Sequence, residues 1–485
     1  MDLEVDVAVI GGGVTGAAIA RELSRYDLRI VLLEKEADLC FRTSKATNGI
    51  VHSGFYEEPG TLRARLCVES NRVFDELCRE LGVLFERPGY LVVAFDDGGV
   101  GRLEELLRQG VEAGVPGLRM VWREELLKME PNISREAVAA LYSPTAGVVS
   151  PFELTIALAE NAAQNGAKIL TCAEVVDITA KTECLLLKTR RGIVRARFVV
   201  NAAGPHADEI ARMVGDNSFE ITLSKRQMCI LDKRTGKLIR HLLSPAPTPG
   251  KRRFLIPTVY GNLMAGAGDI TLTRDKFDVS TTWKGFREAI ANAKMLVPVI
   301  SERDVITAFT GLIPIHSGVD DFIIAPSRQE PRLIHAVIDA PGITAAPGVA
   351  REVVETLRKA GLKLTIREGF VPFRRPIPRF SSLPYEERCR LVEANPLFGH
   401  VVCRCEHVTE GEIVEAIKRG ATTMDGVKFR TRAGMGRCQG AFCGPRIMKI
   451  LARELKTPPE NITKKGGNSK YVLYKTKQLL KEEIK

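Results

Sequence analysis

The first 36 residues show the pattern of a strand, a tight turn, a helix and a second strand. Residues 7–10 are all apolar, residues 17–23 place alanine, isoleucine and leucine at helical spacing, and residues 30–33 are again apolar. Short apolar runs of this length are typical of strands buried in a parallel sheet, and the segment between them has the period of a helix. The pattern therefore predicts a β-α-β unit at the start of an α/β domain.

The turn between the first strand and the helix is rich in glycine. It matches a GxGxxG turn, in which Gly11 permits the tight turn, Gly13 lets the backbone approach a pyrophosphate and Gly16 lets the helix pack closely. The helix N-terminus adds free N–H groups and a positive dipole end. Glu34 ends the second strand, where a carboxylate can accept both hydroxyls of an adenosine ribose. Together these features predict a site for an adenine dinucleotide, which is either NAD or FAD.

Strand and helix patterns further along divide the chain into several domains. Helices are expected over 61–81, 103–112, 151–165 and 345–359, and strands over 90–94, 168–178, 198–201, 228–231, 254–258, 263–267, 321–325 and 333–338. The expected architecture is α/β: a discontinuous Rossmann-like dinucleotide-binding domain (1–82, 146–220 and 319–365), an α+β substrate domain (83–145 and 221–318), an extended linker rich in Pro and Arg (366–398), a small helical domain (399–455) and a basic tail (456–485).

Composition and charge narrow the class of protein. At 485 residues the chain exceeds the size of one hydrophobic core, and its 45% hydrophobic and 27% charged residues are typical of a soluble globular protein. The sequence has no run of eighteen apolar residues and no leader pattern, so we expect a cytoplasmic protein whose contact with a membrane is at most peripheral. The net charge of +11 is spread along the chain, which favours anionic ligands or an acidic partner over nucleic acid.

Four of the eleven cysteines are clustered near the C-terminus. One residue separates Cys403 from Cys405, and four residues separate Cys438 from Cys443. Clustered thiols in a reducing compartment indicate a metal site rather than disulfides. Zinc usually takes paired CxxC knuckles, which are absent, so the uneven spacing around a glycine-rich turn favours a two-iron cluster, with zinc as the alternative.

The surroundings of these cysteines fit an anionic metal cluster. A helix is expected between the two cysteine pairs, capped by Thr409 with Glu412 three residues on, and Pro445 can open a second helix whose N-terminus faces the thiolates. The charge of the cluster could be offset by four arginines: Arg404, Arg430, Arg432 and Arg437. An iron–sulfur cluster accepts electrons singly, whereas nicotinamide passes them only as hydride; a flavin can do both, so the dinucleotide is predicted to be FAD.

With these features assembled, the chain resembles the FAD-dependent glycerol-3-phosphate dehydrogenase and L-2-hydroxyglutarate dehydrogenase group of the D-amino-acid-oxidase-like superfamily. Residues 401–446 resemble the bacterioferritin-associated-ferredoxin type of [2Fe-2S] domain. The stretches that carry the resemblance are 11–16, 47–54, 59–62, 201–204, 340–347 and the cysteine spacing around Gly436-Arg437-Cys438-Gln439-Gly440.

This resemblance implies a set of cofactor-binding residues. The residues expected at FAD are Gly11, Gly13, Val14, Thr15, Gly16, Glu34, Lys35, Thr43, Ser44, Thr47, Asn48, Gly49, Val51, Ala203, Gly204, Gly342, Ile343 and Thr344. The residues expected to ligate the [2Fe-2S] cluster are Cys403, Cys405, Cys438 and Cys443. The resemblance also implies partner redox subunits.

The resemblance favours oxidation of sn-glycerol 3-phosphate, with electrons leaving through the cluster to a partner subunit or another acceptor. The chain departs from the family at position 313, where Ile313 replaces an anion-binding arginine after Gly311-Leu312. Candidate catalytic residues are His52, Tyr260 and His316, and candidate groups for the anionic substrate are Lys225, Arg226 and Arg253. Three other readings stay open: an L-2-hydroxyglutarate-type dehydrogenase, an imino-acid or opine dehydrogenase, and an electron-transfer subunit with a vestigial pocket.

Overall fold

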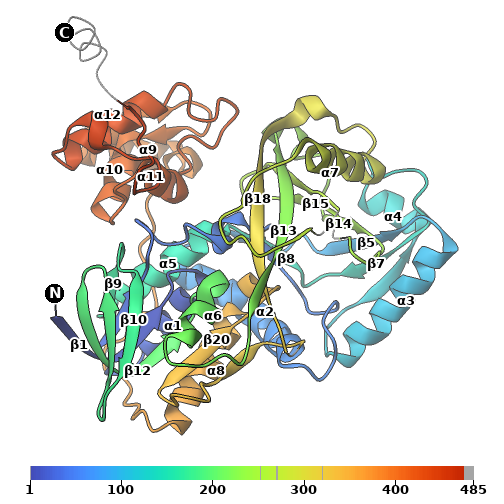
Figure 1. The fold of residues 1–485 in the computed structure, drawn as a ribbon. Helices are drawn as coiled ribbons and strands as arrows, with labels where there is room; N and C mark the ends of the chain where they lie inside the picture. Colours follow the sequence, from blue (N-terminus) through green and yellow to red (C-terminus); the bar gives the residue numbers. More distant parts are fainter. Residues whose placement is uncertain (1, 252, 269–270, 319, 474–485) are drawn as a thin grey trace, which may run out of the picture.

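A computed structural model describes residues 2–251, 253–268, 271–318 and 320–473. The chain forms two large sheet-containing parts and a smaller helical part that lies at the upper left in Figure 1. The last twelve residues of the predicted basic tail lie outside the described residues. No helix in the described part of the chain is long and apolar enough to cross a bilayer.

The first part is built on an eight-stranded sheet with the order β10-β11-β12-β1-β2-β9, to which β20 and β19 are added at β12. The N-terminal strand β1 (Asp2–Ile10) pairs in parallel with β12 (Gly192–Asn201) and with β2 (Ile30–Leu33). The remaining strands are β9 (Lys168–Leu170), β10 (Val175–Ala180), β11 (Leu185–Thr189), β19 (Ile323–Pro326) and β20 (Leu333–Val337). This topology places the glycine turn after β1 next to the C-terminal end of β12.

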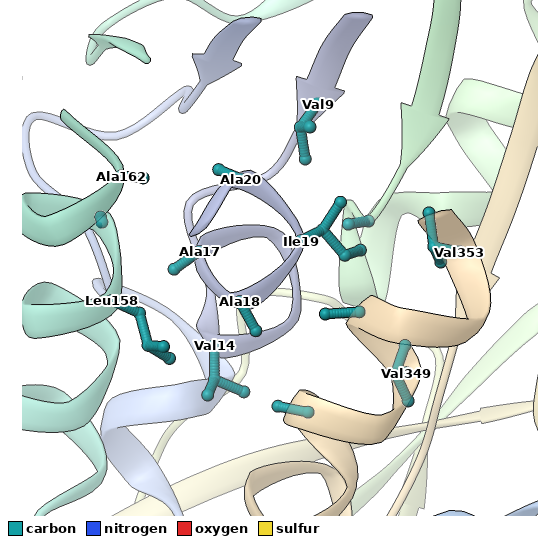
Figure 2. Packing of buried hydrophobic residues seen from close by; sticks show 14 of the residues in the cluster. Val9, Val14, Ala17, Ala18, Ile19, Ala20, Leu158, Ala162, Val349 and Val353 are labelled. Atoms are coloured by element: carbon teal, nitrogen blue, oxygen red, sulfur yellow. The ribbon is translucent and has the colours of Figure 1, made fainter. Parts of the chain in front are cut away.

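Helix α1 (Val14–Leu23) packs between α5 (Pro151–Gln164) and α8 (Gly342–Lys359). Figure 2 shows its small side chains facing Leu158 and Ala162 of α5 on one side and Val349 and Val353 of α8 on the other. Three alanines in α1 let these neighbours approach closely, and all of these side chains are buried. The glycine turn at the start of α1 is therefore held by a close-packed core.

The second part is a nine-stranded sheet with the order β17-β13-β16-β15-β14-β5-β7-β6, in which β18 pairs with β13. Its early strands are β5 (Tyr90–Ala94), β6 (Arg119–Trp122) and β7 (Ala139–Ser143). Its later strands are β13 (Ile221–Leu231), β14 (Leu242–Pro245), β15 (Phe254–Pro257), β16 (Leu263–Gly266), β17 (Thr271–Thr273) and β18 (Val305–His316). The helices α3 (Asp97–Glu112), α4 (Arg123–Met129) and α7 (Trp283–Leu296) accompany this sheet. Because β14 pairs with β5, two distant segments of the chain complete one sheet.

The chain also forms a short three-stranded sheet and the long helix α2 (Leu62–Leu81), which packs against α8 and α5. The short sheet has the order β3-β8-β4, with β3 (Ile50–Val51), β8 (Gly147–Val149) and β4 (Phe85–Glu86). Thr61 caps α2 by accepting a hydrogen bond from the Ala64 N–H, and Gly82 ends it in the left-handed region with φ +62°. The helix predicted over 61–81 is confirmed at both ends.

The helical C-terminal part contains β21 (Val401–Cys403), β22 (Val408–Thr409), α10 (Glu410–Lys418), α11 (Met424–Thr431) and α12 (Gly444–Glu454). The predicted capping box is present, because Thr409 and Glu412 exchange hydrogen bonds at the start of α10. The single helix expected between the cysteine pairs is in fact two helices, α10 and α11. They are separated where Gly420 takes φ +96°.

Three other predictions about local structure were wrong in detail. The strand predicted over 168–178 is two strands, β9 and β10, because the chain breaks at Cys172, which has φ +52°. The helix predicted from residue 345 begins at Gly342, so Ile343 and Thr344 lie in its first turn. The linker predicted as extended contains helix α9 (Tyr385–Ala394), which begins after a proline and carries two acidic residues in its first turn.

The helical part is joined to the first part by a buried ion pair. The Arg430 guanidinium donates to both carboxylate oxygens of Asp38, at 2.5 and 2.8 Å, and the two side chains are only 4% and 3% exposed. Phe429 packs edge-on against Phe41 beside this pair. Arg430, which was expected to offset the charge of a metal cluster, is therefore engaged in the contact between domains.

Candidate active site and metal centre

A cavity of about 890 Å³ lies between the carboxyl ends of β1 and β2 and the nine-stranded sheet. The predicted cofactor residues that line it are Gly11, Gly13, Val14, Thr15, Glu34, Lys35, Thr43, Ser44, Thr47, Asn48, Ala203, Gly204, Gly342 and Ile343. Ligands of α/β proteins bind in such a crevice beyond the strand ends, and the volume suits a dinucleotide-sized ligand.

The glycine turn leaves no space for side chains at two positions. Gly11 has φ +112°, and a Cβ there would lie 2.3 Å from the Ala202 carbonyl oxygen at the end of β12. A Cβ on Gly16 would lie 1.9 Å from the carbonyl oxygen of Gly11. The Val14 N–H donates to Ser44 Oγ at 3.0 Å, which ties the start of α1 to the polar loop that follows β2.

Glu34 lies buried at the end of β2 and lines the cavity. Its carboxylate accepts hydrogen bonds from the Gly12 N–H at 2.7 Å and the Glu36 N–H at 2.8 Å. Burial raises the pKa of Glu34, while these two donors favour the ionised form. Each oxygen keeps acceptor capacity, so the carboxylate fits the two hydroxyls of an adenosine ribose.

The polar loop at 43–48 lies between the two large sheets. Its first turn, Thr43–Ala46, is a 3₁₀ helix, and the Thr43 hydroxyl donates to the carbonyl of Leu312 on β18 at 2.9 Å. A Cβ on Gly311 would lie 2.2 Å from the Ala46 carbonyl oxygen, so only glycine lets the strand come this close. The loop is thus fixed to the substrate side of the cavity as well as to the cofactor side.

His52 lines the cavity just after β3. Its N–H donates to Thr344 Oγ1 at 2.9 Å in the first turn of α8, and its carbonyl accepts from the Asn71 side chain of α2 at 2.9 Å. Two helices and a short sheet therefore fix the backbone of His52 at a position where the residue lines the cavity.

Four predicted cofactor residues do not line the cavity. These are Gly16, Gly49, Val51 and Thr344. Thr344 and Val51 are fully buried, and Gly49 takes φ +72° where a Cβ would lie 2.4 Å from the carbonyl oxygen of Val149. These four residues lie behind the residues that line the cavity and support its walls.

Three catalytic or substrate candidates lie elsewhere. Side chains alternate along a strand, so Lys225 and Arg226 point to opposite faces of β13. Lys225 does not line the cavity, and its Nζ donates to Asp278 at 2.7 Å. Tyr260 lines a separate cavity, where its hydroxyl donates to Glu153 Oε2 at 2.8 Å. His316 ends β18 with a buried Nδ1 that has no hydrogen-bond partner among the described residues, and it also lies outside the lining.

Three cationic side chains line the cavity near β13 and β15, and the lining also contains the carboxylates of Glu57, Glu58, Asp320 and Asp339. Arg226, Lys251 and Arg253 line it, and Arg253 Nη2 donates to Thr248 Oγ1 at 2.7 Å. Burial and the neighbouring Arg102 lower the pKa of Arg253, which indicates that an anion would stabilise the guanidinium there. Ile313, where the resemblance implied an anion-binding arginine, lines the same cavity.

Sequence reasoning missed one pair of cavity residues, Arg63 in α2 and Asp339 just after β20. The guanidinium Nη1 donates to Asp339 Oδ2 at 3.1 Å, and Asp339 Oδ1 has no hydrogen-bond partner among the described residues. Burial raises the pKa of Asp339, and the charge of Arg63 opposes this. The available signal was an acidic residue two positions after the end of β20, a strand that pairs in parallel with β12.

The four clustered cysteines converge as two pairs. Cys405 Sγ and Cys438 Sγ are 3.6 Å apart, and Cys403 and Cys443 are both buried in the core of the helical part. The Cys443 thiol and the backbone N–H groups of Gly434, Glu406 and Cys405 lower the pKa of Cys403 to about 6, which favours thiolate. Gly436 is required beside them, because a Cβ there would lie 2.2 Å from the Cys405 Cβ.

Four cysteines fit a [2Fe-2S] cluster, in which each of the two irons takes two protein sulfurs. In the described part of the chain, no group of three or more His, Cys, Asp or Glu side chains is placed to hold one metal ion. The predicted helix N-terminus is present, because α12 begins directly after Cys443 with Pro445 in its first turn. Among the arginines expected nearby, Arg432 pairs with Glu406 at 2.9 Å and lies 3.8 Å from the Tyr260 ring.

Comparisons with known proteins agree with this geometry. Residues 6–356 match the family model described as FAD dependent oxidoreductase (DAO), and residues 401–453 match the BFD-like [2Fe-2S] binding domain. A glycerol 3-phosphate dehydrogenase from Caloramator mitchellensis is 44% identical over 472 residues, which span 96% of this chain and 98% of that protein. Anaerobic glycerol-3-phosphate dehydrogenase subunit A1 from Haloferax volcanii is 30% identical over 501 residues, covering 92% of this chain and 83% of that one.

A solved structure also matches the first two parts of the fold. The dithionite-reduced L-α-glycerophosphate oxidase from Mycoplasma pneumoniae, with FAD bound, superposes with a TM-score of 0.73 at 28% identity. The superposition covers 79% of this chain and 99% of the oxidase.

Replacement of Cys438 with Ser tests the assignment of the four cysteines. We expect iron and acid-labile sulfide to fall well below the roughly two of each per chain that a [2Fe-2S] cluster contains, because a hydroxyl is a poor ligand for these irons. FAD content should not change. Cys389→Ser, on α9 and outside the four-cysteine group, is the matched control and should keep its iron. Full iron content in Cys438→Ser would contradict the assignment.

Proposed function

Because the chain belongs to the FAD-dependent oxidoreductase (DAO) family and carries a BFD-like [2Fe-2S] domain, we propose that it oxidises sn-glycerol 3-phosphate to dihydroxyacetone phosphate. The observation that carries the proposal is the 44% identity with a glycerol 3-phosphate dehydrogenase over 96% of the chain. The predictions of an α/β fold, of FAD and of a [2Fe-2S] domain are confirmed by these matches.

The proposed reaction removes a hydride and a proton from the secondary alcohol. Bound FAD supplies the two-electron acceptor, and the cluster takes electrons one at a time. His52 is the candidate base: its ring accepts the hydroxyl proton while its backbone, held by Thr344 and Asn71, keeps the ring facing the cavity.

The phosphate group of the substrate must be bound by residues other than Ile313. Ile313 cannot bind an anion, but Arg253, Arg226 and Lys251 line the same side of the cavity. The Thr248 hydroxyl fixes one end of the Arg253 guanidinium, which leaves its other N–H groups for a phosphate oxygen. We assign Arg253 as the principal phosphate ligand.

Electrons leave this chain through the cluster to a partner subunit. The Haloferax volcanii relative is named as one subunit of an enzyme, which supports a hetero-oligomer. Cys405 and Cys438 are partly exposed, whereas Cys403 and Cys443 are buried, so one edge of the cluster faces the surface. Phe442, between the last two cysteines, is 79% exposed, and large apolar side chains at a surface favour docking of a protein.

Anaerobic reduction of the flavin tests the choice of substrate. Addition of sn-glycerol 3-phosphate to the holoenzyme should bleach the flavin absorbance in a single turnover. L-2-hydroxyglutarate, L-proline and opines should leave it unchanged over the same period. Bleaching by one of these compounds, and not by glycerol 3-phosphate, would assign the chain to a different substrate class; no bleaching by any of them would favour a vestigial pocket.

Replacement of His52 with Asn tests the proposed base. Loss of a positioned proton acceptor typically slows the chemical step by about 10²–10⁴-fold. Stopped-flow reduction of the flavin by glycerol 3-phosphate should slow by this factor. FAD stoichiometry and the thermal midpoint should stay close to those of the native protein, because the contacts that fix this segment come from the backbone of residue 52. Reduction at the native rate would remove His52 from the mechanism.

Replacement of Arg253 with Met tests phosphate recognition. Loss of a charge-assisted hydrogen bond is worth about 1.5–3 kcal/mol, so we expect the KM for glycerol 3-phosphate to rise about 10–100-fold. Lys225→Met removes the same charge from a side chain outside the cavity, and it should change the KM less than about twofold. Equal effects of the two replacements would mean that the cation acts only through the overall field of the protein.

A further inference from the structure

A loop of the second part crosses to the first part beside the dinucleotide cavity. It spans residues 274–282, between β17 and α7, and is called the strap below. It contacts α6 (Ala207–Arg212), which follows β12 in the first part. Figure 1 shows α6 and α7 in the two different parts. The strap therefore joins the two parts of the fold that form the walls of the cavity.

Lys276 makes the main contact between the strap and the first part. Its Nζ donates to Asp208 Oδ1 at 2.6 Å and to Glu209 Oε1 at 2.7 Å. The side chains of Lys276 and Asp208 are only 12% and 6% exposed, so this ion pair is largely removed from water. Burial opposes ionisation of Asp208, but the hydrogen bond and the charge of Lys276 lower its pKa. Loss of the lysine would leave a buried carboxylate without its main partner.

Two further contacts lead from these carboxylates to the cavity. Glu209 Oε2 lies 2.8 Å from His206 Nδ1, and His206 Nε2 lies 2.8 Å from Lys35 Nζ. An ammonium group can only donate, so Nε2 accepts, and the imidazole proton is on Nδ1 and is donated to Glu209. Burial and the charge of Lys35 lower the pKa of His206, which favours this neutral form. All three residues line the cavity, and Lys35 directly follows Glu34.

Phe277 of the strap covers the cationic side chains at the same end of the cavity. The centroid of its ring lies 4.9 Å from Arg42 Cζ, 5.5 Å from Lys35 Nζ and 5.9 Å from the centroid of the His206 ring. A cation within about 6 Å of a ring centroid is attracted to the face of the ring. Phe277 is nevertheless 59% exposed, so it lies over these side chains from the outside.

The base of the strap is held by the second part. Lys225 Nζ of β13 donates to Asp278 Oδ2 at 2.7 Å, and the Thr310 hydroxyl of β18 donates to the carbonyl of Ser280 at 3.0 Å. The strap is thus attached to one part at its base and to the other part through Lys276 and Phe277. Opening of the cavity at this end requires the second set of contacts to break.

We propose that the strap is a clasp that retains FAD. Lys276 and Phe277 hold Lys35 and His206 against the adenosine end of the cofactor, and FAD enters or leaves after these contacts break. The adenosine end is the one at Glu34, whose carboxylate fits the hydroxyls of the ribose. This role does not depend on which substrate is oxidised.

Release of FAD from the holoenzyme tests the clasp. The fluorescence of FAD rises when the cofactor leaves the protein, so the rate of release is followed after dilution. Replacement of Lys276 with Met should accelerate release by at least about tenfold, because the buried carboxylates lose their partner and the strap opens more often. Lys276→Arg can still bind both carboxylates, and its rate should stay within about threefold of the native rate.

Two other variants make the test selective. Phe277→Ala removes a mostly exposed side chain and should accelerate release several-fold, because the contacts with Arg42 and Lys35 are lost. Lys233→Met is the matched control. Lys233 also forms an ion pair between parts, with Glu406 of the helical part at 3.0 Å, but it lies outside the lining of the cavity. Its replacement should leave FAD release within about twofold of the native rate.

Release of FAD at the native rate by Lys276→Met would overturn the proposal. If that variant does not fold, release at the native rate by Phe277→Ala does so instead. Equal acceleration in Lys276→Met and Lys233→Met would also overturn it, because any lost contact between parts would then loosen the cofactor. Oxidation of glycerol 3-phosphate is not measured in this experiment, so its outcome is independent of the proposed function.

Discussion

The buried ion pair between Arg430 and Asp38 is the contact on which the arrangement of the two redox parts depends. Two charges that are almost fully removed from water are stable only as a pair, because loss of one partner leaves an uncompensated buried charge at a cost of about 3–5 kcal/mol. Asp38 lies four residues after Glu34, on the segment that leads into the polar loop at 43–48. The helical domain is therefore anchored to the same stretch of chain that forms the wall of the flavin cavity.

This contact between the domains explains why two arginines have partners that the neighbouring sequence did not predict. Arg430 lies in the last turn of α11 and Arg432 directly follows that helix, before the cysteine loop. Their charge suggested a role beside the cluster. In the structure Arg430 reaches across to Asp38, and Arg432 bridges Glu406 and the face of Tyr260. A long, flexible side chain can serve either neighbour, and only the docking of the domains decides between them.

Local signals were sufficient for much of the fold. The apolar run before Gly11, the helix over 61–81 and the Thr409–Glu412 capping box each depend on residues close in sequence, and all are present. The glycines at 11 and 16 were predicted for a similar reason, since a turn so tight excludes a Cβ.

Predictions that required tertiary information were less successful. Lys225 and Arg226 are neighbours in sequence but face opposite sides of β13, so only the orientation of the strand shows that Arg226 lines the cavity. Tyr260 and His316 were chosen as residues able to move a proton, and the structure places both outside that cavity. Arg63 and Asp339 were overlooked because their ion pair joins residues 276 positions apart.

The pairing of β14 with β5 also has a consequence for the order in which the chain folds. The nine-stranded sheet is built from two segments of the chain that are separated by β8 to β12. The first sheet is complete only when β20 pairs with β12. Neither sheet is complete until most of the polypeptide has left the ribosome, so unpaired strand edges persist during synthesis and need protection from aggregation. The small domain after residue 400, built from contacts close in sequence, can form rapidly and dock last.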